Sequence, residues 1–502
     1  MKRLIFILLL FPLLGLSECN TSPQAEPTGG SGYSTPEKEG ISSRSILQFV
    51  EALEAAQPDA IHGVMLRRHG KIVAEGWWAP YNPESPHLLW SLSKSFTSTA
   101  IGMAQDEGLL SIDDQVISFF PEYTPEEPSE NLKNMRIRDL LRMNTGQVTE
   151  VSFLRMQTDN WVEAFLAHEV PFKPGTHFLY NSMATYMCSA IIQKVTGMTT
   201  LEFLTPRLFE PLGIENPTWE SCPRGINVGG WGLSVKTEDI SKLGYLYLQK
   251  GEWEGRRLLS EKWVEEATSI QTSNGSNPES DWDQGYGYQF WQCRYNAYRG
   301  DGAFGQYCLV MPEQDAVLAI TSGSDDLQGI LNVVWEHLLP AMQEGTLPPD
   351  SEGVELMNQK LGNLAISTVA GSESSPLASG ISGKIFTLEQ NDRNFQSIAF
   401  SFEDPSPEIT ITGGDGVHTF RAGYQTMVKG MLPGTTVTSD RVAVNGAWET
   451  PDTYTVNIIY YETPESISYT FKFEGNRLLW DTRRKASFSP SHPAQLAGIM
   501  VD

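Results

Sequence analysis

Apolar and polar positions follow two different patterns along the chain. Between residues 37 and 345, segments with helical spacing lie in the middle and strand-like runs lie towards both ends. After residue 381 the chain becomes a series of short segments in which apolar and polar residues alternate. The first pattern predicts an α+β domain, in which an antiparallel sheet built from distant segments packs against a helical region. The second predicts a separate antiparallel all-β domain, either a sandwich or a barrel.

Within the first region the pattern predicts individual elements. Strands are expected at 61–78 (two, around a turn at His69-Gly70), 307–312 and 316–323. Helices are expected at 93–110, 136–146, 182–197 and 327–342. The helices at 136–146 and 182–197 each end at a glycine, which suits a C-cap.

A chain of 502 residues is too long for one compact core, so two or more domains are expected. Shifts in composition along the chain predict the boundaries between them. We expect a signal peptide at 1–19, a flexible tether at 20–36, the α+β domain at 37–345, a linker with one short helix at 346–380 and the all-β domain at 381–502.

The N-terminus has the pattern of a secretory signal. Lys2 and Arg3 precede an apolar run at 4–16, which is too short to span a membrane. The segment that ends at Cys19 resembles a bacterial lipoprotein cleavage box, although Glu18 stands where a small residue is preferred. Lipidation of Cys19 and ordinary cleavage nearby both remain open. The expected location is therefore outside the cytoplasm, periplasmic or in the cell envelope, with a lipid anchor at Cys19 as the one expected link to a membrane.

The net charge and the spacing of the cysteines and histidines bear on which partners and cofactors can be expected. The formal net charge of −25 argues against nucleic acid as a partner, because the two would repel each other. Cysteines 188, 222, 293 and 308 form no CxxC pair, and the histidines show no paired-ligand spacing, so no metal site is indicated. No organic cofactor is expected either. Cys293 and Cys308 flank a predicted hairpin, and the sequence leaves open whether they form a disulfide or remain two buried thiols.

The segment "LWSLSKSFTS" contains the strongest candidate for chemistry. If a helix begins near Ser91, Ser91 and Lys94 lie on one face, about 5–6 Å apart. Serine is a poor nucleophile until a neighbouring group takes its proton, and a lysine can do so when burial lowers its pKa towards neutrality. On spacing alone, a solvated helix lysine that follows a capping serine is the favoured interpretation.

Four segments in order resemble the serine β-lactamase and penicillin-binding-protein superfamily, especially its class C and esterase-like branch. They are "SLSKSFTSTAIGMAQDEGLLSIDDQV" with "IRDLLRMNTG", "PGTHFLYNSMATYMCSAIIQKVTG", "GGWGLSVKTEDISKLGYLYLQKGEWEGRRLLSEKWVEEA" and "GAFGQYCLVMPEQDAVLAITSG". The resemblance covers roughly residues 37–343. It implies a β-lactamase-like fold in which Ser91 is acylated, Lys94 accepts or relays its proton, and Tyr180 is the second proton-transfer group. Tyr180 could act as a base only if nearby cations stabilise its phenolate.

Two departures from the family pattern affect the expected substrate. Ser182 stands where the Tyr-x-Asn pattern has asparagine, and a hydroxyl offers fewer hydrogen bonds than an amide. The Lys-Thr-Gly strand signature is replaced by "RGDGAFGQ", in which Asp301 would repel a carboxylate substrate unless Arg299 offsets it. The backbone N–H groups near Gly302 and Ala303 could still complete an oxyanion hole with that of Ser91.

These observations predict an exported serine hydrolase that cleaves a small-molecule or peptide-like ester or amide through an acyl-enzyme. The departures favour an esterase or amidase over a dedicated β-lactamase, and a D-amino-acid peptidase or peptidoglycan-editing enzyme is the alternative. A catalytically silent binding protein on the same scaffold is the alternative from another class. In a further alternative the C-terminal domain is an adhesin, for which Tyr460, Tyr461 and Trp480 would have to form an exposed patch.

Overall fold

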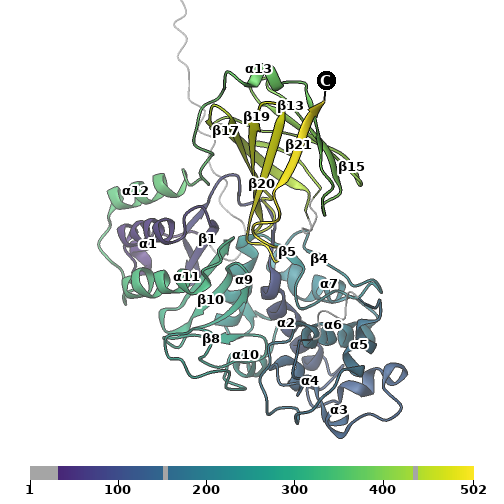
Figure 1. Ribbon diagram of the computed structural model, residues 1–502. Helices are drawn as coiled ribbons and strands as arrows, with labels where there is room; N and C mark the ends of the chain where they lie inside the picture. The colour runs from purple at the N-terminus through teal and green to yellow at the C-terminus, as the bar shows by residue number, and fades with distance from the viewer. Residues whose placement is uncertain (1–31, 151–156, 434–438, 502) are drawn as a thin grey trace, which may run out of the picture.

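The computed structural model describes residues 32–150, 157–433 and 439–501. The expected signal peptide and the possible anchor at Cys19 therefore lie outside the described residues. Within the described residues, no helix has both the length and the apolar character needed to cross a membrane. The chain forms an α+β domain followed by a separate all-β domain, as the sequence pattern predicts (Figure 1).

The elements of the α+β domain are as follows. Its helices are α1 (Ser43–Ala56), α2 (Ser93–Asp106), α3 (Glu130–Asn134), α4 (Ile137–Leu141), α5 (Trp161–Ala167), α6 (Ser182–Thr196), α7 (Thr200–Leu204), α8 (Glu210–Leu212), α9 (Thr237–Leu248), α10 (Glu261–Ala267), α11 (Leu327–Val333) and α12 (Ser351–Leu361). Its strands are β1 (Ile61–Arg68), β2 (Lys71–Trp77), β3 (His87–Leu88), β4 (Thr218–Trp219), β5 (Leu233–Val235), β6 (Glu252–Trp253), β7 (Arg256–Arg257), β8 (Trp291–Gln292), β9 (Tyr298–Gly302), β10 (Gln306–Met311) and β11 (Ala316–Ser322).

One antiparallel sheet joins the two ends of this domain in the order β2-β1-β11-β10-β9-β8. The central strands β10 and β11 are buried along their whole length, because helices cover both faces of the sheet. Leu309 and Leu318 pack into the cluster around α1 and α11, whereas Val310 and Val317 pack into the cluster that includes α9. This burial explains why both strands are continuous apolar runs rather than alternating ones.

Two local expectations are wrong. The helix expected at 136–146 ends at Leu141, because Met143 adopts a left-handed conformation (φ 60°) and turns the chain out of the helix. Cys293 and Cys308 do not face each other: Cys308 lies opposite Gly300 in the β9–β10 pair, and Cys293 lies in the turn after β8. The four described cysteines are all buried and free, so these two are thiols.

The second domain contains α13 (Ala378–Ile381) and a ten-stranded antiparallel sheet that curls into a near-barrel. Its strands are β12 (Ile385–Leu388), β13 (Phe395–Ser401), β14 (Glu408–Gly413), β15 (Gly416–Arg421), β16 (Val428–Met431), β17 (Arg441–Thr450), β18 (Thr453–Ile459), β19 (Ser466–Glu474), β20 (Arg477–Lys485) and β21 (Leu496–Val501). Tyr460, Tyr461 and Trp480 are buried, so they form no exposed patch of the kind that the adhesin alternative requires. The β20–β21 connection, drawn in yellow, extends towards the α+β domain near β5 (Figure 1).

Candidate active site

Ser91 lies on a short 3-10 turn (Trp90–Leu92) that leads directly into α2. Trp90 adopts a left-handed conformation with φ 47°, which is strained for a bulky side chain and persists only where the surroundings hold it. Strain of this kind concentrates at functional sites. Because the turn leads directly into α2, Ser91 lies at the start of a buried helix, as the Ser-x-x-Lys spacing predicts.

Strand β9 lies against this turn, and its glycines permit the close approach. A Cβ at Gly300 would overlap the side chains of Ser95 and Leu92, and a Cβ at Gly302 would overlap the Leu89 carbonyl oxygen. Both clashes involve atoms of the segment that carries Ser91. The two glycines thus bring the backbone of β9 beside the candidate nucleophile.

Lys94 is buried, with 1% of its surface exposed, and its amine points at the serine. Its Nζ lies 2.9 Å from Ser91 Oγ, 3.2 Å from Ser182 Oγ and 2.6 Å from the Gly230 carbonyl oxygen. None of these three partners is a carboxylate. The solvated-lysine alternative is therefore wrong, and the amine is within hydrogen-bonding distance of the hydroxyl that it would have to deprotonate.

The electrostatics favour a neutral amine. Burial lowers the pKa of the Lys94 ammonium from 10.5 to about 7, although the carboxylates of Glu150 and Asp301 oppose this by raising it. At neutral pH a large fraction of Lys94 is consequently unprotonated and can accept a proton.

Tyr180 lies beside the same serine. Its hydroxyl is hydrogen-bonded to Ser91, its ring centre lies 4.8 Å from Lys94 Nζ, and its ring stacks on Trp291 at 5.3 Å. Burial, reinforced by the charge of Asp301, raises the pKa of the Tyr180 phenol well above 10. At neutral pH the pair therefore consists of a phenol and an amine, and the Tyr180 phenolate is not the resting form.

Ser182 begins α6 and belongs to the site, whereas its neighbour Asn181 is structural. The Asn181 side chain accepts hydrogen bonds from the first turn of α6 and donates one to Gln147, so it caps the helix. The Ser182 hydroxyl instead contacts Lys94, and its backbone N–H donates to Glu150 at 2.9 Å. A serine therefore occupies the position that the family pattern gives to asparagine.

Arg299 and Asp301 form a buried ion pair on β9. Asp301 Oδ2 lies 2.8 Å from Arg299 Nη2 and accepts a hydrogen bond from its Nε at 3.0 Å. The same guanidinium donates to the Asp281 carbonyl oxygen and to Cys293 Sγ, and it stacks over Trp282. Arg299 thus offsets the charge of Asp301, and its own donors are directed into the protein.

The proposed oxyanion residues lie where β9 ends. Gly302 is the last residue of β9, and Ala303 opens the turn into β10, followed by Phe304 with a left-handed φ of 68°. The Ala303 carbonyl accepts a hydrogen bond from Gln306, which fixes the turn. Through the contact of Gly302 with Leu89, this turn lies next to the segment that carries Ser91.

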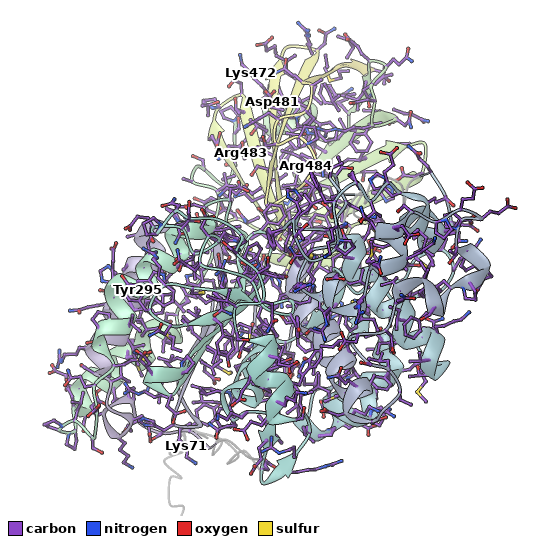
Figure 2. All side chains as sticks on the ribbon, turned by 90° about the horizontal axis from the view of Figure 1, so that it is seen from below. Lys71, Tyr295, Lys472, Asp481, Arg483 and Arg484 are labelled. Atoms are coloured by element: carbon purple, nitrogen blue, oxygen red, sulfur yellow. The ribbon has the colours of Figure 1, made fainter. Side chains whose placement is uncertain are left out.

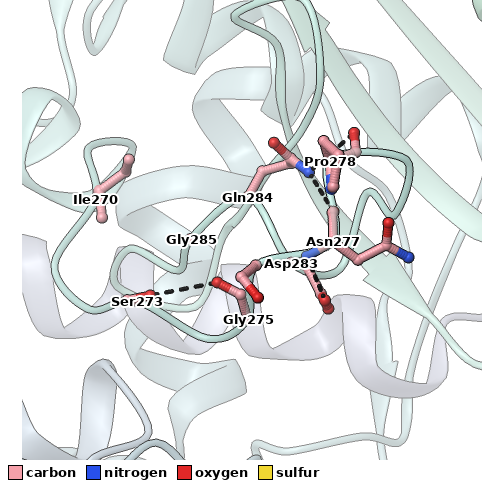
Figure 3. A pocket seen from close by; sticks show the side chains of 9 residues that line it. Ile270, Ser273, Gly275, Asn277, Pro278, Asp283, Gln284 and Gly285 are labelled. Carbon is pink, nitrogen blue, oxygen red and sulfur yellow. Dashed lines mark hydrogen bonds between the residues drawn. The ribbon is translucent and has the colours of Figure 1, made fainter.

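Two contributors to the site have no motif that sequence reasoning could recognise. Glu150 lies in the irregular segment after α4, and nothing in the neighbouring sequence distinguishes it from an exposed acid. Gly230 contributes only a backbone carbonyl, although the Gly229-Gly230 pair opens one of the resembling segments. A separate shallow pocket of about 320 Å³ is lined by residues between Ile270 and Gly285, and none of the candidate catalytic residues lines it (Figure 3).

The fold and this arrangement of serine, lysine and tyrosine define a protein of the serine β-lactamase and penicillin-binding-protein superfamily. Comparison with known proteins agrees. The model of the Beta-lactamase family matches residues 50–333, more than half of the chain, and the chain belongs to that family.

Individual relatives are distant. A 6-aminohexanoate-dimer hydrolase of Paenarthrobacter ureafaciens is 25% identical over 305 residues, which cover 55% of this chain and 75% of the relative. A lovastatin esterase of Penicillium rubens is 28% identical over 152 residues, 25% of this chain and 37% of the relative. A solved structure from Bacillus anthracis, named as a 6-aminohexanoate-dimer hydrolase, matches with a TM-score of 0.52 at 19% identity. The match covers 64% of this chain and 89% of the Bacillus anthracis chain. The curated relatives indicate a hydrolase of the β-lactamase fold.

Proposed function

We propose that the protein is a serine hydrolase that cleaves an ester or amide through an acyl-enzyme on Ser91. The observation that carries the proposal is the buried Lys94 amine, 2.9 Å from the Ser91 hydroxyl and with only uncharged hydrogen-bond partners. A neutral amine has two N–H donors and one lone pair. The Gly230 carbonyl can only accept, and the Ser182 hydroxyl can accept the second N–H, so the lone pair is left for the Ser91 proton.

Acylation then proceeds with balanced proton transfers. Ser91 Oγ attacks the carbonyl carbon while its proton moves to Lys94 Nζ, and the resulting oxyanion is stabilised by backbone N–H groups of Ser91 and the β9–β10 turn. The leaving alcohol or amine takes the proton of the Tyr180 phenol as the carbon–oxygen or carbon–nitrogen bond breaks. The Lys94 ammonium returns its proton to Tyr180, which restores a neutral amine beside the acyl-enzyme.

Deacylation uses the same amine. Water attacks the ester of Ser91 and passes one proton to Lys94, and the proton then moves to Ser91 Oγ as the acid is released. The net reaction is hydrolysis, and the side chains return to their starting protonation states.

The surroundings of the site favour a substrate whose acyl part carries no carboxylate. Arg299, the cation of β9, is fully buried and paired with Asp301, so its charge is not presented to a substrate anion. Asp301 itself would repel one. Ser182 also replaces the amide that would hold a β-lactam side chain, and these features together support an esterase or amidase.

Labelling with a fluorophosphonate tests the proposal directly. Intact-protein mass spectrometry should show one adduct, located at Ser91 by peptide mapping. Ser91→Ala should abolish it, Lys94→Ala should slow it by at least about a hundredfold, and the control Ser276→Ala, at an exposed serine, should label like the wild type. A wild-type protein that takes no label would support the silent binding protein. A panel of p-nitrophenyl esters, D-aminoacyl anilides and nitrocefin would then separate esterase, D-peptidase and β-lactamase activity.

We also propose that the protein is exported, on the strength of Lys2, Arg3 and the apolar run that follows. Cell fractionation and the mass of the mature protein test this. A Cys19→Ala variant that leaves the membrane fraction would support lipidation, whereas an unchanged distribution would indicate ordinary cleavage.

A further inference from the structure

The connection between β20 and β21 brings an aromatic side chain of the second domain to the candidate active site. The ring of Phe488 lies 4.9 Å from that of Trp90 and 5.0 Å from that of Phe304. Trp90 and Phe304 also contact each other, with ring centres 6.4 Å apart. Trp90 precedes Ser91, and Phe304 follows Ala303, so the three rings adjoin both the nucleophile and the expected oxyanion hole.

The exposure of Phe488 shows that this contact is incomplete. Phe488 is 72% exposed, although it touches two other rings, whereas Phe304 is buried. A large apolar side chain on a loop, held against a catalytic segment and still mostly open to solvent, presents apolar surface that a ligand can cover. Trp90 and Phe304 both hold left-handed backbone conformations, which are strained for aromatic residues.

Further contacts hold the second domain in place next to the nucleophile. The backbone N–H of Leu88 donates to the Glu462 carbonyl at 2.9 Å, and the Tyr81 hydroxyl donates to the Thr463 carbonyl at 3.3 Å. A Cβ at Gly323 would overlap the Pro464 carbonyl oxygen. The turn after β18 therefore packs beside β3, the strand that leads into Ser91.

Arg484 connects that turn to the loop that carries Phe488. Its guanidinium lies 3.0 Å from the Glu465 carboxylate, and its backbone N–H donates to the Ser491 carbonyl at 2.8 Å. Figure 2 shows Arg484 closer to the α+β domain than Lys472 and Asp481, which lie farther along the second domain. The loop is thus tied to a docked turn, and the position of Phe488 follows from the packing of the two domains.

We propose that Phe488 completes the substrate-binding site, so that Trp90, Phe304 and Phe488 bind the apolar alkyl or aryl part of the ester or amide that Ser91 attacks. This inference rests on the proposed function and deepens it. The substrate class is a neutral, apolar acyl compound. The Arg299 guanidinium is fully buried and paired with Asp301, which suits such a substrate, because the cation is not presented to an acyl carboxylate.

The test compares two alkyl fluorophosphonates, one with an ethyl and one with an octyl chain, at concentrations at which neither forms micelles. The readout is the ratio of the second-order rate constants for labelling of Ser91, octyl over ethyl. Phe488→Ala should lower this ratio about tenfold, since loss of the ring exposes roughly two CH2 groups of the longer chain. Phe488→Leu should recover most of the ratio. Val417→Ala, which removes another exposed apolar side chain of the same domain, should leave the wild-type ratio.

Each outcome decides between the two proposals. A wild type that labels at Ser91, with a Phe488→Ala variant of unchanged ratio, overturns the role of Phe488 and leaves the serine hydrolase standing. A wild type that does not label at Ser91 overturns both. Urea unfolding of each variant shows whether the variant still folds. If Phe488→Ala does not fold, the octyl-to-ethyl ratio of Phe488→Leu decides whether Phe488 contributes to substrate binding.

Discussion

The pH dependence of Ser91 acylation should report the protonation of Lys94. Burial lowers the pKa of its ammonium to about 7, and only the neutral amine can accept the serine proton. The value of kcat/KM should therefore rise with pH along a limb centred near 7. At pH 7 about half of the molecules then carry the base, compared with about one in three thousand for an exposed lysine with its ordinary pKa.

Glu150→Gln should move this limb to lower pH. The carboxylate of Glu150 raises the pKa of Lys94, so removal of its charge should lower that pKa. The glutamine amide keeps an oxygen that can accept the hydrogen bond from the Ser182 N–H, so the geometry is retained. If the limb moves down by about half a pH unit, the neutral fraction of Lys94 at pH 6 rises from about one tenth to about one quarter.

The assay is the initial rate of p-nitrophenyl ester hydrolysis, with substrate well below KM, between pH 5 and 9 at constant ionic strength. Glu126→Gln, at an exposed carboxylate, is the matched control and should keep the wild-type limb. A wild-type rate that does not change across this range, or that rises only above pH 9, would refute Lys94 as the base. A limb that moves upward in Glu150→Gln would refute the assigned effect of the carboxylate.

Three further predictions concern the same residues. Tyr180→Phe should lower turnover of amides about a hundredfold and that of p-nitrophenyl esters much less, because p-nitrophenolate leaves without a proton; steady-state kinetics with both leaving groups check this. Gly300→Ala should destabilise the fold by about 1–3 kcal/mol in urea unfolding, because the new methyl group overlaps Ser95 and Leu92; a neutral effect would show that β9 can move away. The free energy of unfolding of the wild type relative to Lys94→Met should rise by about 2 kcal/mol from pH 7 to pH 9, because unfolded Lys94 binds a proton that the folded protein does not, and a constant difference would contradict the lowered pKa.

The parts of the site that follow local rules could be predicted from the sequence. Ser91 and Lys94 are three residues apart on one helical surface, and the strands at 61–78 and 316–323 carry apolar runs of the right length. The C-cap at Gly197 follows from the same kind of local rule, since a left-handed conformation (φ 74°) ends α6 there.

What depends on packing between distant segments could not be predicted. Nothing near residue 143 shows that its backbone becomes left-handed and ends α4 early. The Gly230 carbonyl reaches Lys94, and Glu150 reaches the Ser182 N–H, only because distant segments converge on the start of α2. Phe488 has an unremarkable sequence context, and its place beside Trp90 follows from how the two domains pack.

Arg299 and Lys94 are two buried basic side chains near Ser91, but their surroundings shift their pKa values in opposite directions. This difference explains how Lys94 can act as a base. Arg299 is paired with Asp301, and although burial opposes its charge, its pKa is raised by Cys293 and Asp301, so it stays a cation. Lys94 has hydroxyls and a carbonyl as its nearest partners, so burial is only partly offset by Glu150 and Asp301, and its pKa falls to about 7. A carboxylate in place of Ser182 would hold the lysine charged and remove the base. The serine at this position is therefore consistent with catalysis, because it supplies a hydrogen bond to the amine without supplying a counter-charge.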